Sequence, residues 1–140
     1  MGNRRLKRNV FQRLFGIPAT GKPKDKNCWD YSDGLVSLDM DRVPELREAW
    51  GAIRLESEDM PRRILLVRGE GDTFYALDNC CKHGKRRLDP VSGENQVQCC
   101  SLGKSTYGLD GTLISGPAEE GIAAFKVKRD RQMLTIVLPR

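Results

Sequence analysis

The sequence predicts a mainly β protein, a small antiparallel sandwich or barrel built from short strands. Stretches in which apolar and polar residues alternate recur along the main body of the chain, and this alternation is typical of strands that are buried on one face. Turn sequences separate them, most clearly Gly69-Glu70-Gly71-Asp72, which lies between two such stretches. Closely spaced short strands with one helix favour an antiparallel sandwich or barrel.

Taken in chain order, the expected elements are short. The strands cover residues 35–39, 52–56, 63–68, 73–77, 96–99, 112–115, 125–128 and 133–138. One helix is expected over residues 43–50, with Asp41 as a candidate cap and Pro44 in its first turn. Asp110-Gly111 and Arg129-Asp130 supply further turns.

Length and charge divide the chain into two regions. With 140 residues, 39% of them hydrophobic and 31% charged, the chain has the composition of one ordinary globular domain, and no apolar run is long enough to cross a bilayer. Residues 1–27 carry eight Lys or Arg against one acid, a net charge of +7, which leaves −2 of the total of +5 for residues 28–140. We therefore separate a basic arm and linker, residues 1–27, from a domain, residues 28–140. The slightly acidic domain argues against a nucleic-acid-binding protein.

The arm has the pattern of a short basic amphipathic helix over residues 4–15. Leu6, Val10 and Leu14 recur every four residues with basic side chains between them, and Gly16 follows. Such a helix either contacts an anionic membrane surface or a partner protein, or it packs on its own domain or forms a loosely ordered tail. The apolar core of a signal peptide does not follow the charges, so a cytoplasmic location is expected.

Cysteine and histidine are concentrated in two short segments. Cys80 and Cys81 follow one expected strand, Cys99 and Cys100 follow another, and His83, the only histidine of the sequence, belongs to the first segment. Thiolate and imidazole are ligands of zinc and of iron–sulfur clusters, so two such loops at neighbouring hairpin tips predict one metal centre. A disulfide between the loops, such as Cys80 with Cys100, and a thiol redox protein are the alternatives, although a cytoplasmic protein rarely keeps a disulfide.

The first segment carries a family resemblance. From Phe74 to Leu88 the chain has a strand, then Asp78-Asn79, then a Cys-x-His pair at Cys81 and His83, and a leucine five residues further on. This pattern resembles the first cluster loop of the Rieske [2Fe–2S] family, in which that Cys and that His are cluster ligands. The resemblance continues through Val97-Gln98-Cys99, Gly103, Tyr107-Gly108-Leu109-Asp110-Gly111 and Gly116-Pro117-Ala118, and it covers roughly residues 34–138. It implies a Rieske-like antiparallel β sandwich or barrel with two cluster-binding loops and a [2Fe–2S] cofactor.

The second loop departs from the family pattern. Rieske proteins place Cys-Pro-x-His-Gly there, and this sequence has no second histidine. Aligning Gly103 puts Cys99 at the cysteine position, whereas aligning the Tyr107 motif puts Cys100 there. The resemblance therefore implies an atypical, Cys/His-ligated cluster. Its candidate ligands are Cys81, His83, Cys99 and Cys100, with Cys80 as a replacement for one cysteine of the second loop. Ser101, Ser105 and Tyr107 are expected either to donate hydrogen bonds to cluster sulfurs or to serve as ordinary turn and strand residues.

We expect a one-electron carrier, the ferredoxin-like component of a redox system. Electron transfer needs no catalytic acid or base, and the sequence has no second domain for a mononuclear iron, so a complete oxygenase is not expected. A thiolate in place of an imidazole adds negative charge, which should place the potential below the ordinary Rieske range. The basic residues around the first loop, Lys82, Lys85, Arg86 and Arg87, either favour an acidic redox partner or belong to an ordinary solvated loop. The alternative is a zinc-bound or metal-free Rieske fold that serves as a structural or interaction module.

Overall fold

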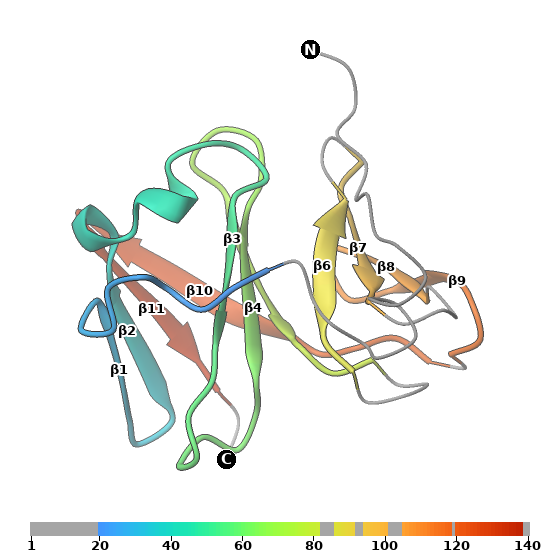
Figure 1. Cartoon of the computed structure of the whole chain (residues 1–140), viewed down its shortest axis with the longest axis horizontal. Coiled ribbons are helices and arrows are strands. Elements are labelled where there is room, and N and C mark those ends of the chain that lie inside the picture. Colours follow the sequence, from blue (N-terminus) through green and yellow to red (C-terminus); the bar gives the residue numbers. More distant parts are fainter. Residues whose placement is uncertain (1–19, 82–85, 92–93, 101–104, 119, 139–140) are drawn as a thin grey trace.

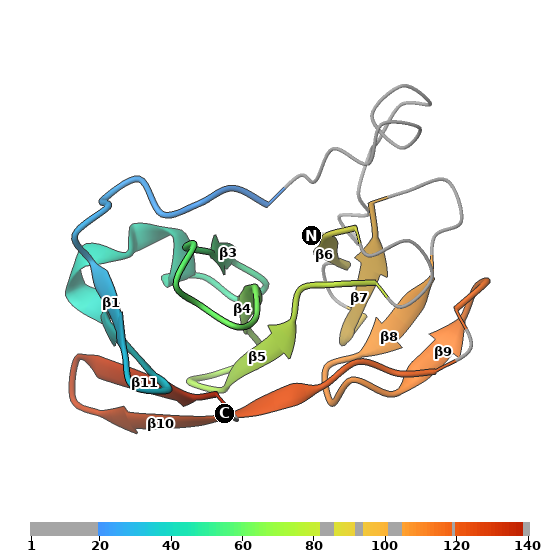
Figure 2. The same ribbon diagram turned by 90° about the horizontal axis from the view of Figure 1, so that it is seen from below.

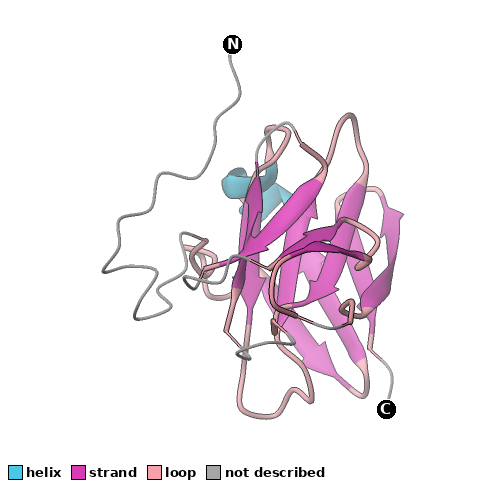
Figure 3. Ribbon diagram, turned by 90° about the vertical axis from the view of Figure 1, so that its right-hand side faces the viewer, coloured by secondary structure: helices cyan, strands magenta, loops and turns pink. Residues whose placement is uncertain are grey.

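The computed structural model describes residues 20–81, 86–91, 94–100, 105–118 and 120–138. Its strands are β1 (Trp29–Ser32), β2 (Leu35–Asp39), β3 (Ala52–Leu55), β4 (Ile64–Arg68), β5 (Phe74–Asp78), β6 (Leu88–Val91), β7 (Gln96–Cys99), β8 (Thr106–Gly108), β9 (Leu113–Ser115), β10 (Ala124–Asp130) and β11 (Met133–Val137). Two short 3-10 helices, η1 (Met40–Arg42) and η2 (Pro44–Leu46), follow β2. The mainly β fold class predicted from the sequence is confirmed, and strands dominate the view in Figure 3.

The strands form two antiparallel sheets. The large sheet has seven strands in the order β1-β2-β11-β10-β5-β4-β3, and the small sheet has four in the order β6-β7-β8-β9. The small sheet is inserted in the chain between β5 and β10, and it stands beside the large sheet at the right of Figure 1. Figure 2 shows the large sheet curled, with β5 and β10 leading toward the small sheet.

Strand β4 separates two hydrophobic cores. Ile64 and Leu66 belong to the core of the large sheet, whereas Leu65 and Val67 belong to the core of the small sheet. All four side chains are fully buried, because successive side chains of a strand point to opposite faces and both faces of β4 are covered. The small sheet, which carries the second cysteine loop, is therefore packed directly on the frame formed by the large one.

The prediction of a helix over residues 43–50 is wrong. The chain makes 3-10 turns there instead, in which Leu46 N donates to Val43 O and Arg47 N donates to Pro44 O. Val43 has φ −125° and ψ 76°, since a residue before proline is kept out of the helical region. Trp50 has a positive φ of 68°, so the backbone leaves any helical path before β3 begins.

Three strands of the structure, β1, β6 and β8, fall outside the expected set. β6 contains Pro90, which a strand tolerates at the edge of a sheet, where β6 lies. β8 is only three residues long, too short for an alternating pattern. The basic helix expected over residues 4–15 lies outside the described residues. Within the described ranges, no helix has the length and apolar character needed to cross a membrane.

The described part of the linker contacts both sheets. Thr20 N donates to Oδ1 of the buried Asp89 on β6 at 2.7 Å, and Arg54 N on β3 donates to Gly21 O at 3.0 Å. In Figure 1 this segment is the blue trace that runs from the small sheet across β3 and β4. Residues 20 and 21 thus fix the end of the linker at the side of the molecule that carries the small sheet.

Candidate metal centre

The topology brings the two cysteine segments together. The first follows β5, the second begins at the last residue of β7, and β6 lies between them in the chain. Because β6 pairs with β7 so that Leu88 lies opposite Cys99, the residues that return from the first loop run beside the second. Cys81 and Cys99 are both buried, with exposed fractions of 0% and 1%, and both belong to the core of the small sheet.

Tyr107 lies against the first cysteine loop. Its hydroxyl is 3.4 Å from Cys81 Sγ, and both residues are fully buried. Tyr107 is on β8, opposite Val97 of β7, so the small sheet itself carries this hydroxyl to a sulfur of the other loop. Either atom could be the donor in this contact; donation by a tyrosine hydroxyl to a thiolate sulfur is one of the two roles that the sequence predicts for Tyr107, and it stays a prediction.

Ser105 supports the second loop. Its carbonyl accepts a hydrogen bond from Cys99 N at 2.8 Å, and its Oγ accepts one from Ala118 N at 3.1 Å. Gly116 lies so close that a Cβ atom there would be 2.4 Å from Ser105 Cα, and Gly116 has a φ of +106°. Glycine is therefore required at this approach of two backbones, and Ser105 is held from two sides.

Asn79 closes the base of the first loop. Its backbone N–H donates to Arg63 O at 2.9 Å, and its side-chain Oδ1 accepts from Leu88 N at 2.7 Å. The contact with Leu88 ties the chain before the loop to the chain after it, and the contact with Arg63 ties Asn79 to the residue before β4. Asn79 is fully buried, and its Nδ2 has no hydrogen-bond partner among the described residues.

The two cysteines of the second segment interact with each other. A hydrogen bond from the Cys99 thiol lowers the pKa of the Cys100 thiol to about 7, although burial and the nearby Asp89 carboxylate act in the opposite direction. Backbone N–H groups add to the lowering. Because the thiolate is the form that binds a metal, Cys100 is better prepared for ligation than an ordinary cysteine.

The predicted ligands have different surroundings. Cys80 is half-buried and lies outside the core that holds Cys81 and Cys99, and Cys28 is buried in the core of the large sheet. All five cysteines lie within the described ranges, and none of them forms a disulfide there. His83 and Ser101 lie outside the described residues. Over the part of the chain that is described, no three His, Cys, Asp or Glu side chains form a group that could hold a metal ion.

An ion pair joins the first loop to the large sheet. Arg87 donates to Glu56 through Nε at 2.5 Å and through Nη2 at 2.8 Å. Arg54 also donates to this carboxylate, at 3.3 Å and 3.4 Å. Burial would raise the pKa of Glu56, but the hydrogen bonds and charges of Arg87 and Arg54 outweigh it and hold that pKa below its usual value. Arg87, expected in the basic rim, therefore has its charge balanced by a carboxylate within the same molecule.

Sequence reasoning did not assign a role to Glu56 or to Asp89. Glu56 lies 31 residues from Arg87, and a solvent-exposed acid at the end of a strand would have the same local sequence. Asp89 lies in β6, a strand that the sequence pattern did not predict, and its contact with Thr20 spans 69 residues. Neither partner is identifiable without the fold.

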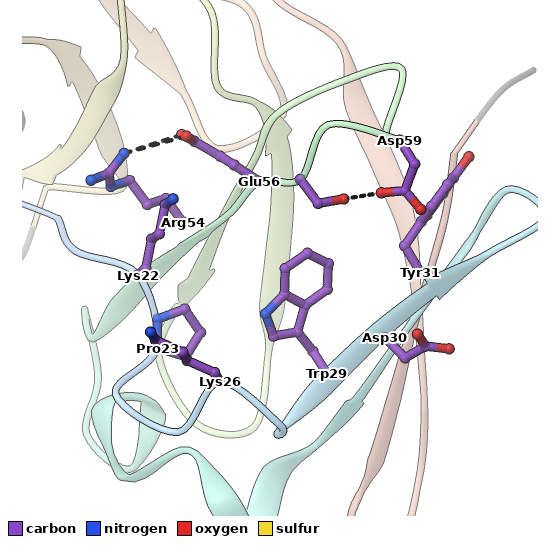
Figure 4. Close-up of a pocket in the computed structure, with 10 residues that line it drawn as sticks. Lys22, Pro23, Lys26, Trp29, Asp30, Tyr31, Arg54, Glu56 and Asp59 are labelled. Carbon is purple, nitrogen blue, oxygen red and sulfur yellow. Dashed lines mark hydrogen bonds and ion pairs between the residues drawn. The ribbon is translucent and has the colours of Figure 1, made fainter.

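A cavity of about 430 Å³ is lined by residues none of which is a cysteine. Its walls come from β1 and from the end of β3, the two edge strands of the large sheet, and from the linker. In Figure 4 Trp29 stands in the middle, with Lys22 and Arg54 on one side and Asp30 and Asp59 on the other. The Arg54–Glu56 contact forms part of its upper wall.

Comparison with known proteins agrees with this arrangement. The chain is similar to the ferredoxin of carbazole 1,9a-dioxygenase from Nocardioides aromaticivorans IC177, with 21% identity and a TM-score of 0.59 over 72% of this chain and 93% of that one. It is similar to the plasma membrane Rieske protein PetC3 from Synechocystis PCC 6803, with 13% identity and a TM-score of 0.52 over 61% and 85% of the two chains. The quaternary ammonium Rieske monooxygenase CntA is 22% identical, with a TM-score of 0.52, but the match covers 68% of this chain and only 29% of CntA.

At these identities the solved structures establish the fold, and the family follows from the sequence. No curated protein sequence matches the chain. The family model described as the Rieske [2Fe-2S] domain matches residues 41–126, more than half of the chain. This range includes both cysteine segments, His83 and Tyr107. The chain therefore belongs to the Rieske [2Fe–2S] domain family, whose domain implies a [2Fe–2S] cluster.

Proposed function

We propose that this chain is a one-electron carrier, a ferredoxin-like component of a redox system, with a [2Fe–2S] cluster ligated by Cys81, His83, Cys99 and Cys100. The observation that carries the proposal is the burial of Cys81 and Cys99, from two separate loops, in one core of a Rieske domain. A cluster bound there supplies reversible one-electron chemistry.

The family's ordinary ligand set does not fit this sequence. In Rieske centres two cysteines bind one iron and two histidines bind the other, and the sequence contains one histidine. A set of three thiolates and one imidazole uses donors that the two segments do contain, and these are accepted ligand types for iron–sulfur clusters. We therefore propose that a third cysteine takes the place of the missing second histidine.

Cys100 is a better candidate than Cys80 for the third thiolate. Cys100 is buried beside Cys99 and shares a hydrogen bond with it. Cys80 is half-buried, and its N–H bends back to Asp78 O at 2.7 Å. Since a redox centre is shielded from water by its protein shell, the more buried sulfur is the one we assign.

Two polar groups tune this site in the proposal. The Tyr107 hydroxyl, 3.4 Å from Cys81 Sγ, donates to that sulfur and stabilises the added negative charge of the reduced state. Ser105 holds the Cys99 backbone through its carbonyl. A third thiolate acts in the opposite direction to the tyrosine, because negative charge disfavours reduction. The net expectation is a potential below that of Rieske centres with two histidines.

The partner that we propose is an oxygenase or reductase component with an acidic docking face. A similar solved structure is a complex of reduced oxygenase and oxidized ferredoxin in carbazole 1,9a-dioxygenase. For this chain, Lys82 and Lys85 flank His83 in the sequence, and complementary charge accelerates the encounter of redox partners. Both lysines lie outside the described residues, so their part in docking stays a prediction, as does membrane or partner contact through residues 4–15.

The experiment is anaerobic purification followed by iron, sulfide and zinc analysis and EPR of the dithionite-reduced protein. Two irons and two sulfides per chain with a [2Fe–2S] signal are expected. Cys81→Ser and Cys100→Ser should lose or change that signal. Cys80→Ser, next to Cys81, is the matched control, and Cys28→Ser is a control from the core of the large sheet. Both should keep the signal. A Cys100→Ser protein with an unchanged signal, together with loss in Cys80→Ser, would overturn the assignment of Cys100.

A second candidate function is a zinc-bound or metal-free interaction module. The single histidine of the sequence favours it. In an ordinary Rieske cluster two histidines bind one of the irons, and that iron would keep at most one imidazole here. The same measurement decides. Zinc in place of iron, or a folded protein that takes up neither metal from an iron- and sulfide-supplemented anaerobic preparation, would favour the module over the electron carrier.

A further inference from the structure

Two consecutive residues of the chain hold both cysteine loops. Cys81 N donates to Arg86 O at 2.7 Å, and Cys100 N donates to Arg87 O at 3.1 Å. Arg86 and Arg87 immediately precede β6, so they stand between the first loop and the strand that pairs with β7. The backbone of both buried cysteines is therefore attached to the same short segment, and a displacement of that segment moves both.

The side chain of Arg87 fixes this segment to the large sheet. Glu56, which follows β3, receives two hydrogen bonds from the Arg87 guanidinium. The pair is well shielded, with the Glu56 side chain 11% exposed and that of Arg87 31% exposed. Two parallel contacts between planar groups restrict orientation as well as distance, so they define where the Arg87 backbone can lie.

Glu56 is itself held in place from the other side. Arg54, on β3, contacts the same carboxylate, as Figure 4 shows. Arg54 N is also bonded to Gly21 O, so the Glu56 carboxylate is in contact with the edge of the large sheet as well as with Arg87. The contacts thus run from the rigid sheet through Glu56 and Arg87 to Cys100.

We propose that Glu56 is a positioning residue for the metal centre, which acts by fixing Arg87 and, through the Arg86 and Arg87 carbonyls, the backbones of Cys81 and Cys100. Glu56 directly follows β3 of the large sheet and comes 25 and 44 positions before those cysteines in the sequence. The effect of Glu56 on a bound cluster rests on the proposed function. The effect of Glu56 on the backbones of the two cysteines does not rest on it, because all the hydrogen bonds involved join residues of the protein.

The test uses the metal-free, fully reduced chain first. Amide hydrogen exchange is measured by NMR for Cys81, Cys100 and Leu66 in wild type and in Glu56→Gln. The Cys100 amide should exchange at least about tenfold faster in the variant, because its acceptor residue is released, while Leu66 in the centre of β4 stays unchanged. Asp59→Asn, which alters a carboxylate lining the same cavity, is the matched control and should change none of the three.

A graded series keeps the test independent of folding. Glu56→Asp retains the charge but shortens the side chain, and Arg87→Lys retains the charge but cannot form the double contact. Both should speed Cys100 exchange less than Glu56→Gln. Unchanged Cys100 exchange in all three variants would overturn the proposal. Equal acceleration at Cys100 and Leu66 would also overturn it, since that result indicates general destabilisation and not a local positioning role.

The second readout concerns the iron-loaded protein. Under the proposed function, Glu56→Gln should shift the EPR signal of the reduced cluster and shorten the lifetime of its visible spectrum, with Asp59→Asn unchanged. An identical signal and lifetime in Glu56→Gln would overturn the role at the metal centre. If the exchange result holds while wild type takes up no iron, the proposed function fails and the positioning of the cysteine loops by Glu56 stands.

Discussion

Substitution of Gly116 tests how tightly the second loop is built. Gly116 follows β9 and has a φ of +106°, and a Cβ there would be 2.4 Å from Ser105 Cα and 2.9 Å from Ser105 N. Gly116→Ala therefore adds backbone strain, about 1–3 kcal/mol, and a clash with backbone that no rotamer change relieves, again about 1–3 kcal/mol. Together they predict a loss of about 2–6 kcal/mol from the free energy of unfolding.

Two other glycines separate strain from collision. Gly71 has a φ of +63° but nothing within 4 Å of its added Cβ, and Gly21 has open space without a positive φ. Gly71→Ala should cost about 1–2 kcal/mol, and Gly21→Ala should stay within about 0.5 kcal/mol of wild type.

Urea unfolding of the metal-free, reduced protein measures all three variants under the same conditions. The expected order of destabilisation is Gly116→Ala, then Gly71→Ala, then Gly21→Ala. If Gly116→Ala is no less stable than Gly71→Ala, the close approach of Gly116 to Ser105 does not exist in solution. The support that Ser105 gives to Cys99 through its carbonyl would then be in doubt as well.

Three further results are expected from the same structure. Tyr107→Phe removes the hydroxyl beside Cys81 Sγ and should lower the free energy of unfolding by about 1 kcal/mol, measured in urea; no change would show that this contact contributes nothing. Because the pKa of Glu56 is lowered in the folded chain, its stabilisation is complete above the unfolded value of about 4.3 and is lost as pH falls through the folded value. The melting temperatures of wild type and Glu56→Gln should therefore differ at neutral pH and converge in acid, and a constant difference would contradict this. Leu65→Ala and Leu66→Ala should each cost about 2–5 kcal/mol, because both faces of β4 are buried; a near-zero cost for either one would place that face in solvent.

Local pattern predicted most of the strands. The alternating stretches around β2 and β3 coincide with strands because half-buried strands select alternating side chains, and the turn sequence at residues 69–72 indicated the hairpin of β4 and β5. The pattern around residues 43–50 was misleading, since proline and a cap residue also suit 3-10 turns, and Trp50 has a positive φ that its local pattern does not indicate. β6 was hidden by Pro90, whose tolerance depends on an edge position that only the sheet order defines.

The candidate site divides in the same way. Motif spacing pointed to Cys81 and to the second cysteine pair, and the structure buries Cys81 and Cys99 in one core. Alignment left Cys99 and Cys100 as rival matches to one family position, and the preference for Cys100 over Cys80 depends on burial, which spacing does not report. Arg87 shows most clearly what sequence patterns cannot predict. In sequence it is one of several loop cations, and in the fold it is bound to Glu56.

By itself, the sequence determined the chemical inventory of this protein: five cysteines, one histidine, a basic first region and the order of the Rieske motif. These are properties of composition and spacing, and folding cannot change them. Tertiary structure alone decided which groups meet, such as the Tyr107 hydroxyl with Cys81 and the Glu56 carboxylate with Arg87. The physical reason is that side-chain periodicity reports only which face of its own strand a residue occupies. Contacts between segments 26 or 31 residues apart depend on how sheets pair and pack, which no local pattern encodes.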